Sequence, residues 1–154
     1  MIDRLFAWLK ESEGNVASAG NELQLAVAAL LLEAAVVVDG HFDPQERDVV
    51  RRVLQRAFTL SPEATQQLIA AAQRQHEQSA QLFGFTSTVN ERVDGARRIE
   101  IIEMLWEVAY ADGVLDPLED TLLRRIAGLI DVSDHERGEA KRRVLQRLGM
   151  QPAE

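Results

Sequence analysis

Two short stretches of the sequence carry acidic residues at matching positions. They are Asp39-Gly40-His41-Phe42-Asp43-Pro44-Gln45-Glu46 and Asp112-Gly113-Val114-Leu115-Asp116-Pro117-Leu118-Glu119. Asp, Gly, Asp, Pro and Glu recur at five of the eight positions, at an offset of 112 − 39 = 73 residues, which indicates an internal duplication. Carboxylate oxygens are the ligands that calcium and magnesium prefer. The candidate ligands for such an ion are Asp39, Asp43, Glu46, Asp112, Asp116 and Glu119.

Most of these acids also fit a purely structural role. In the first stretch, Gly40 can end a helix because it has no Cβ, and Asp43 can cap the next helix. Pro44 then takes the first helical position, and Glu46 completes a capping box three residues after the cap. The second stretch repeats this pattern with Gly113, Asp116, Pro117 and Glu119. Each stretch therefore predicts a helix, a tight turn and a second helix.

Asp39 and Asp112 are harder to explain as caps. Each lies at the C-terminal end of a predicted helix, where the helix dipole disfavours a carboxylate by about 0.3–1 kcal/mol. Either the carboxylate accepts backbone N–H groups of the following turn, or it binds a cation. We favour a metal or another specific partner for these two residues, and capping alone for the other four acids.

The arrangement of the two stretches decides whether the acids can act together. If two related halves pack about a pseudo-twofold axis, both turns lie at one end of the bundle, and the crowded carboxylates repel unless a proton or a cation neutralises them. An independent EF-hand is excluded, although the stretch matches its fifth to twelfth positions. The first and third ligands would be Ala35 and Val37, or Val108 and Tyr110, and none of these has a carboxylate.

No pattern of catalytic residues is present. The histidines are His41, His76 and His135, and none is spaced for a zinc site. His41 could bind a metal beside Asp39, but a turn residue is the simpler interpretation, since Val114 replaces it in the second stretch. There is no phosphate-binding Gly loop and no nucleophile elbow. We therefore do not expect an enzyme.

Composition limits the class of protein. The 154 residues suffice for one domain with a real core, and the absence of cysteine excludes disulfides and thiol chemistry. The net charge of −8 favours cations or basic partners and disfavours nucleic acid. Basic residues crowd the end of the last predicted helix, where the helix dipole favours them: Lys141, Arg142, Arg143 and Arg147.

Hydrophobic periodicity predicts an all-α fold of about seven helices and no strand. Residues 1–20 are expected to form a short amphipathic helix and a linker, and residues 21–150 the main domain, with repeats 21–82 and 88–148. Residues 83–87 should be a break between the halves, with both of its phenylalanines in the core. The expected helices of the main domain are 21–39, 44–58, 62–82, 88–93, 96–111, 117–130 and 133–148.

The N-terminal segment has an apolar face but no membrane signal. Ile2, Leu5, Phe6 and Leu9 recur at helical spacing, and we expect this face to pack on the body of the protein rather than on a partner or a membrane surface. The segment lacks the long apolar core and cleavage site of a signal peptide. The longest apolar run, residues 25–38, is too short to span a bilayer. We expect a cytoplasmic protein without stable membrane insertion.

The second stretch and its surroundings resemble a known family. Residues 108–119, within the longer segment 100–130, resemble the signature of the tellurite-resistance TerB-like family, and residues 36–46 resemble its earlier, weaker motif. The resemblance covers about residues 20–148. It implies an all-helical fold of about seven helices in two related halves, with a metal bound by acidic residues at the two Asp-Gly turns.

Three classes of function remain. We favour an acidic helical module that binds a divalent metal, calcium or magnesium, and acts in a stress response to tellurite or other chemicals by binding rather than catalysis. The alternatives are a protein-interaction scaffold that binds no metal, and a hydrolase that uses carboxylates or a metal. Other proteins are the expected partners, and homo-oligomerisation stays open.

Overall fold

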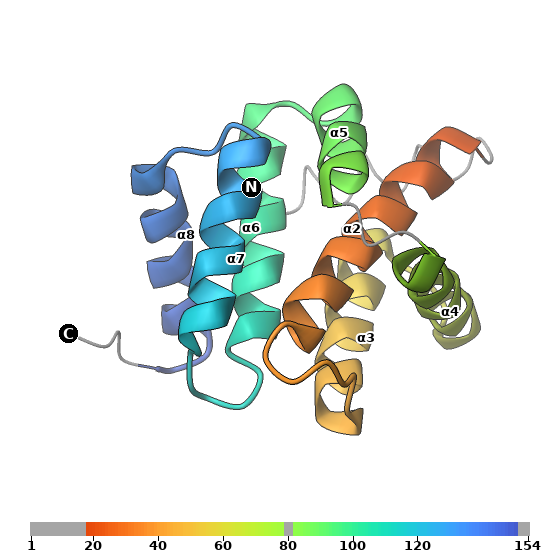
Figure 1. The fold of residues 1–154 in the computed structure, drawn as a ribbon, viewed down its shortest axis with the longest axis horizontal. Coiled ribbons are helices and arrows are strands. Elements are labelled where there is room, and N and C mark those ends of the chain that lie inside the picture. The colour runs from red at the N-terminus through yellow and green to blue at the C-terminus, as the bar shows by residue number, and fades with distance from the viewer. Residues whose placement is uncertain (1–17, 79–81, 151–154) are drawn as a thin grey trace.

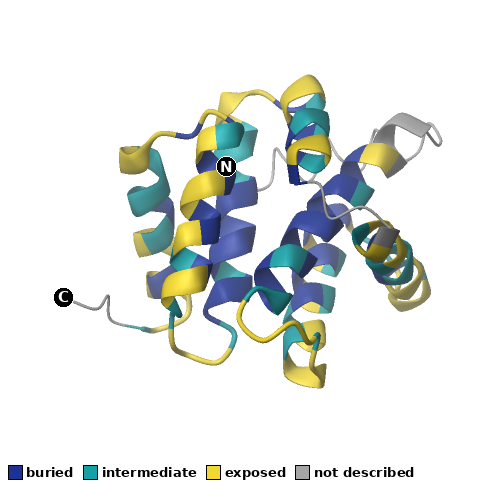
Figure 2. Ribbon diagram, in the orientation of Figure 1, coloured by how far each residue is buried: buried dark blue, intermediate teal, exposed yellow. Residues whose placement is uncertain are grey.

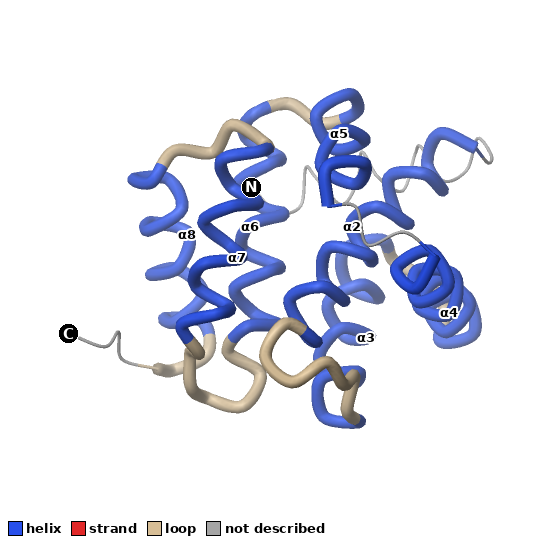
Figure 3. Tube along the Cα trace, in the orientation of Figure 1, coloured by secondary structure: helices blue, strands red, loops and turns tan. Residues whose placement is uncertain are grey.

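The chain folds into helices only, over the part that the structure describes. The structure is a computed structural model and describes residues 18–78 and 82–150. Figure 3 shows helices joined by short loops, without a strand in these ranges. This confirms the predicted all-α class. The helices are α2 (Ser18–Val36), α3 (Pro44–Phe58), α4 (Pro62–Gln78), α5 (Leu82–Arg92), α6 (Gly95–Ala109), α7 (Pro117–Leu129) and α8 (Asp134–Arg147).

Helix α2 lies at the centre of the molecule. It packs against α3, α4, α5, α6 and α7, while α8 covers α6 and α7 on the side away from α2 (Figure 1). Its residues 26–32 are all buried, which explains why the sequence is apolar nearly all round this helix (Figure 2). The second half of the chain is built around α6, whose Trp106 is 1% exposed and donates its indole N–H to the Arg137 carbonyl of α8 at 3.2 Å.

The caps of α3, α7 and α8 form where the sequence predicts them. Helix α3 spans Pro44–Phe58, as expected at both ends. Ser133 caps α8 with Glu136 in a capping box, and Gly149 follows the helix with φ 71°. These motifs need hydrogen bonds only within three or four residues, so the local sequence is sufficient to specify them.

The predicted break at residues 83–87 is wrong. Helix α5 runs through it, with Gly84 in its interior. Only one of the two aromatic residues packs on the core: Phe85 is partly buried there, whereas Phe83 is 69% exposed. A glycine inside a helix costs about 1 kcal/mol. Burial of the α5 stripe at Leu82, Thr86 and Val89 offsets that cost, and the stripe packs against neighbours that local sequence does not reveal.

Other boundaries also differ from the prediction: α2 ends at Val36 rather than at residue 39, and α6 ends at Ala109 rather than at residue 111. Helix α2 begins at Ser18, so residues 18–20, expected in a linker, are helical. The first turn of a helix lacks internal N–H partners, and its residue types are therefore a weak guide to where it starts. Thr88, expected to cap a helix with Glu91, lies inside α5 and donates its hydroxyl to the Gly84 carbonyl at 3.2 Å.

The prediction for the N-terminus lies outside the described residues. The amphipathic helix was placed on residues 1–10, and the description begins at residue 18. Among the described helices, none combines the length and apolar character needed to cross a membrane.

Candidate metal-binding site

The two Asp-Gly turns lie next to each other at one end of the helical bundle. One joins α2 to α3 and the other joins α6 to α7, and both loops are at the bottom of Figure 1. A hydrogen bond connects them directly: the Gln45 side-chain amide donates to the Ala111 carbonyl at 3.2 Å. The structure thus brings together two stretches that are 73 residues apart in the chain, counted as 112 − 39.

Each turn has the backbone geometry that the sequence predicts. Gly40 and Gly113 have φ values of 79° and 86°, in the region that favours glycine. Asp43 and Asp116 cap α3 and α7 in complete capping boxes with their glutamates, and a proline begins each helix. The turns therefore hold their carboxylates at fixed positions on the backbone.

Asp39 and Asp112 have a local role as well. The Asp39 carboxylate accepts the His41 N–H at 2.9 Å, and the Asp112 carboxylate accepts the Val114 N–H at 3.1 Å. Of the two explanations that the sequence left open, the structure therefore shows the turn hydrogen bond. This bond uses one oxygen of each carboxylate, and the second oxygen has no hydrogen-bond partner among the described residues.

The six carboxylates also lack basic partners. No Arg, Lys or His of the described ranges forms an ion pair with any of them. Acids elsewhere differ: Asp48, for instance, pairs with Arg51 at 2.6 Å and with Arg52 at 3.1 Å. The end of the bundle that holds both turns is therefore a local concentration of unneutralised negative charge.

Charge crowding is strongest at the second capping box. The Glu119 side chain is buried, with the residue only 7% exposed, whereas its counterpart Glu46 is half-buried. Burial, together with the nearby carboxylates of Asp112, Asp116 and Glu46, raises the pKa of Glu119 to about 7. The pKa of Glu46 is also raised, mainly by burial and then by Asp43, Asp39 and Asp112. Each glutamate is affected by an acid of the other turn.

The side chains are near each other without forming a finished ion site. No three Asp, Glu or His side chains in the described ranges converge on one point closely enough to hold a metal. Asp39, Asp43 and Asp112 are exposed, and each carboxylate accepts a backbone N–H through one oxygen. His41 is exposed in the first turn, where its N–H bonds to Asp39.

Comparison with known proteins places the chain in a family. The family model described as "Tellurite resistance protein TerB" matches residues 24–142. The chain belongs to the TerB family. The matched range begins in α2, includes both Asp-Gly turns and reaches into α8. A search of curated proteins and a search of solved structures found no match.

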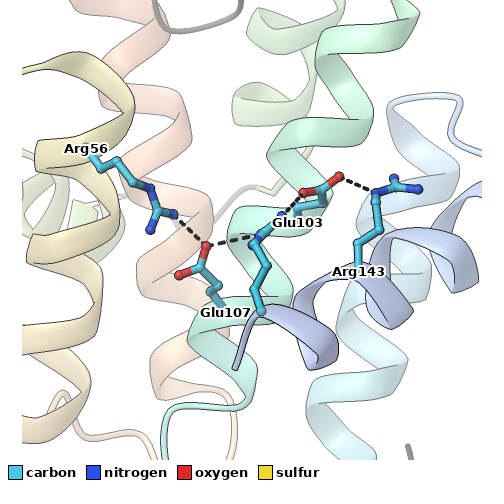
Figure 4. A network of polar contacts seen from close by, with 5 residues as sticks. Arg56, Glu103, Glu107 and Arg143 are labelled. Atoms are coloured by element: carbon cyan, nitrogen blue, oxygen red, sulfur yellow. Dashed lines mark hydrogen bonds and ion pairs between the residues drawn. The ribbon is translucent and has the colours of Figure 1, made fainter. Parts of the chain in front are cut away.

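This TerB-family chain also contains a polar network that the sequence did not reveal. Glu103 of α6 is 6% exposed and accepts from Arg143 at 2.9 Å and from Arg147 at 2.7 Å, both on α8. Glu107 accepts from Arg56 of α3 at 2.5 Å and also contacts Arg147 (Figure 4). The network joins three helices. Its only sequence signal is an acid inside the buried run 101–106, and the partners lie 40 or more residues away.

Three other basic residues of this chain also have partners. Arg142 pairs with Glu139 at 2.6 Å, and the Lys141 ammonium lies 5.3 Å from the centre of the Trp106 ring. His76, which the sequence left unassigned, contacts Glu33 of α2 at 2.5 Å. The basic end of α8 therefore takes part in helix–helix packing.

Proposed function

We propose that this TerB-family protein binds a divalent cation, calcium or magnesium, with carboxylates from both Asp-Gly turns. The observation that supports the proposal is the gathering of six carboxylates at one end of the bundle, joined across the turns by the Gln45–Ala111 hydrogen bond and without a basic partner in the described ranges. A hard divalent ion with oxygen ligands neutralises such a group of charges.

The donors fit such an ion in chemistry, and Asp39, Asp43 and Asp112 are also exposed. Asp39 and Asp112 would supply their second oxygens, since the first is held by the turn N–H. The four capping acids would keep their capping bonds and offer their other carboxylate oxygens to the ion: Asp43, Glu46, Asp116 and Glu119. Small side-chain rotations that keep these hydrogen bonds would turn the second oxygens of the exposed aspartates toward the ion.

Calorimetric titration with calcium, magnesium, manganese and zinc tests the proposal. We expect heat of binding for calcium or magnesium, and at a hundredfold excess over Kd a stabilisation of about 2.7 kcal/mol. Asp112→Asn keeps the size and the hydrogen bond to the turn but removes the charge, so it should abolish that stabilisation. Asp39→Asn should act in the same way.

Asp131→Asn is the matched control. Asp131 follows α7 at the end opposite Asp116, is exposed, and has φ 63°, which asparagine tolerates. This variant should keep the full metal response. If divalent ions stabilise the wild type, Asp112→Asn and Asp131→Asn equally, the effect is general screening and the metal site is refuted.

A metal-independent interaction scaffold is the second candidate. Large apolar side chains are exposed beside the acids: Val38 is 44%, Val114 67% and Leu118 52% exposed. A surface of this kind fits a partner that is both basic and apolar. Absence of metal binding in the titration would favour this function.

We further propose that the protein acts in the cytoplasm, in a response to tellurite or another chemical stress, by binding rather than catalysis. The family description supports the stress role, and the lack of a recognisable nucleophile in the sequence supports binding rather than catalysis. Survival of a tellurite-sensitive strain that carries wild type or Asp112→Asn tests the stress role. Metal-dependent hydrolysis that is lost on Asp112→Ala would establish an enzyme instead.

A further inference from the structure

Large apolar side chains are exposed at the end of the bundle that holds the two Asp-Gly turns. Val38 lies in the first turn, Val114 in the second and Leu118 in the first turn of α7, and each is 44% or more exposed. Leu148, directly after α8, is 43% exposed, and α8 ends at the bottom of Figure 1, as both turns do. Phe83, the other exposed large apolar residue of the described ranges, lies on α5, at the top of Figure 1. We call the first four residues the apolar end patch.

Carboxylates without basic partners lie directly beside this patch. Val38 precedes Asp39 in the chain, and the Asp112 carboxylate accepts the Val114 N–H at 3.1 Å. Neither aspartate forms an ion pair with a basic residue of the described ranges. The hydrogen bond between the two turns keeps them adjacent. This end of the bundle is therefore both apolar and negatively charged, and exposed apolar patches mark interaction sites in soluble proteins.

The charge of this end selects the class of partner. The carboxylates of the two turns repel anionic lipid headgroups and nucleic-acid phosphates, as does the net charge of −8. A second copy that docked through the same end would bring an equal set of carboxylates into contact, because such an interface uses the same surface on both subunits. A protein segment that carries apolar side chains next to lysine or arginine matches both features of the surface.

The fold selects how that segment binds. The described ranges contain helices and loops but no strand, so this end offers no sheet edge to which a partner strand could add. Side chains must then provide the contacts, and an amphipathic helix presents an apolar row flanked by charged residues. We propose that the apolar end patch docks a basic amphipathic helix of a partner protein, and that a divalent ion bound at the turns releases this helix.

The release rests on the proposed metal site, whereas the docking does not. The ion and the basic side chains of the helix compete for the same carboxylate oxygens of Asp39 and Asp112, of which one in each residue is held by a turn N–H. An ion that takes the other oxygens leaves the basic side chains of the partner without their counter-charges. The coupling is reciprocal, so the helix must weaken binding of the ion by the same factor.

Fluorescence anisotropy with a designed peptide tests the docking. The probe is a fluorescein-labelled peptide of about 18 residues, all leucine or lysine, with the leucines on one face of the helix. The full chain is titrated into it in EDTA. We expect binding, and Val114→Ser combined with Leu118→Ser should raise the Kd about tenfold or more, because a few apolar anchors carry most of the affinity of an interface. Phe83→Ser is the matched control, since it removes a side chain of similar exposure on α5, and it should leave the Kd within about twofold.

A second peptide separates docking from attraction by charge alone. It keeps the lysines and has serine in place of every leucine, and it should bind about tenfold more weakly than the first peptide or not at all. Equal affinity for the two peptides means that only charge attracts them, and overturns the proposal. The proposal is also refuted if the leucine–lysine peptide does not bind, or if Phe83→Ser weakens it as much as the double variant does.

Two other occupants are tested with the protein alone. Sedimentation velocity detects a dimer, and flotation with phosphatidylserine vesicles detects membrane binding. If the leucine–lysine peptide does not bind, and the double variant loses either a dimer or vesicle binding that the wild type shows, the patch belongs to a second copy or to a membrane, and the proposal is wrong.

Calcium tests the release. Saturating calcium should raise the Kd of the leucine–lysine peptide about tenfold, beyond the effect of potassium chloride at equal ionic strength. Asp112→Asn should weaken the peptide in EDTA about threefold and remove the calcium effect. Calorimetric titration of calcium without peptide reports on the metal site alone. If calcium binds there but does not displace the peptide, the release is wrong and the metal site stands. If the peptide binds and calcium does not, the docking stands, and the release fails together with the metal site.

Discussion

Glu119 is expected to make the metal-free protein less stable as the pH rises. The carboxyl has an ordinary pKa of 4.5 and a pKa of about 7 in the folded protein, because it is buried among other carboxylates. Between these values the unfolded chain loses the proton while the folded protein keeps it. The contribution of Glu119 to stability is therefore most favourable below pH 4.5, falls through this window, and carries its full penalty above pH 7.

The size of the effect follows from the shift. A change from 4.5 to about 7 corresponds to about 3 kcal/mol at about 1.36 kcal/mol per pKa unit. We expect a loss of stability of about 2 kcal/mol from Glu119, since solvent at the turn screens part of the repulsion between the carboxylates. Glu119→Gln removes the ionisation and retains the capping box, because glutamine also offers an oxygen to the Asp116 N–H, which Glu119 accepts at 3.0 Å.

Urea unfolding in EDTA at pH 5 and pH 8 measures the effect. Between pH 5 and pH 8, the free energy of unfolding should fall by about 2 kcal/mol more in the wild type than in Glu119→Gln. Glu136→Gln is the control, because the stability contribution of Glu136 changes with pH in the opposite direction. Glu136 occupies the same position in the α8 capping box, but hydrogen bonds from Ser133 lower its pKa, so its contribution is present at neutral pH and is lost as the pH falls.

If the free energy of unfolding depends on pH in the same way in the wild type and in Glu119→Gln, burial and crowding do not raise the pKa of Glu119. Calcium offers a further check that depends on the proposed function. An ion bound at the turns should lower the pKa of Glu119 and reduce the difference between the two proteins at pH 8.

Two other predictions concern stability alone. Gly113→Val and Gly40→Val should each destabilise the protein by about 1–2 kcal/mol. The cost comes from the positive φ at both positions and not from a clash, because no atom lies within 4 Å of an added Cβ. A melting temperature within a degree of wild type would contradict the helix-ending role. Replacing Arg143 and Arg147 together by alanine should cost about 3 kcal/mol, since it leaves the buried Glu103 carboxylate unpaired, whereas Glu103→Met should cost less than half of that. Urea unfolding of both variants checks the order, and the reverse order would show that the carboxylate is not the costly group.

The sequence by itself determined the all-helical class, the helix α3 and the two Asp-Gly turns. The α3 boundaries, the caps at Asp43 and Asp116, and the positive φ of both turn glycines follow from residues within about four positions of each other. Such interactions are local, so the residue types alone specify them. The repeated octamer also pointed to the family that the chain belongs to.

Tertiary structure decided how these elements meet. The Gln45–Ala111 bond spans 66 residues, and the Glu103–Arg143 pair spans 40. Nothing in two similar octamers indicates that Glu119 is buried and Glu46 is not, because the difference comes from the helices packed around each turn. Helix α5 passes through Gly84 for the same reason: the burial of its apolar stripe outweighs a local preference of about 1 kcal/mol. Local preferences are of that size, whereas burial sums over many contacts, and only the folded chain shows which contacts form.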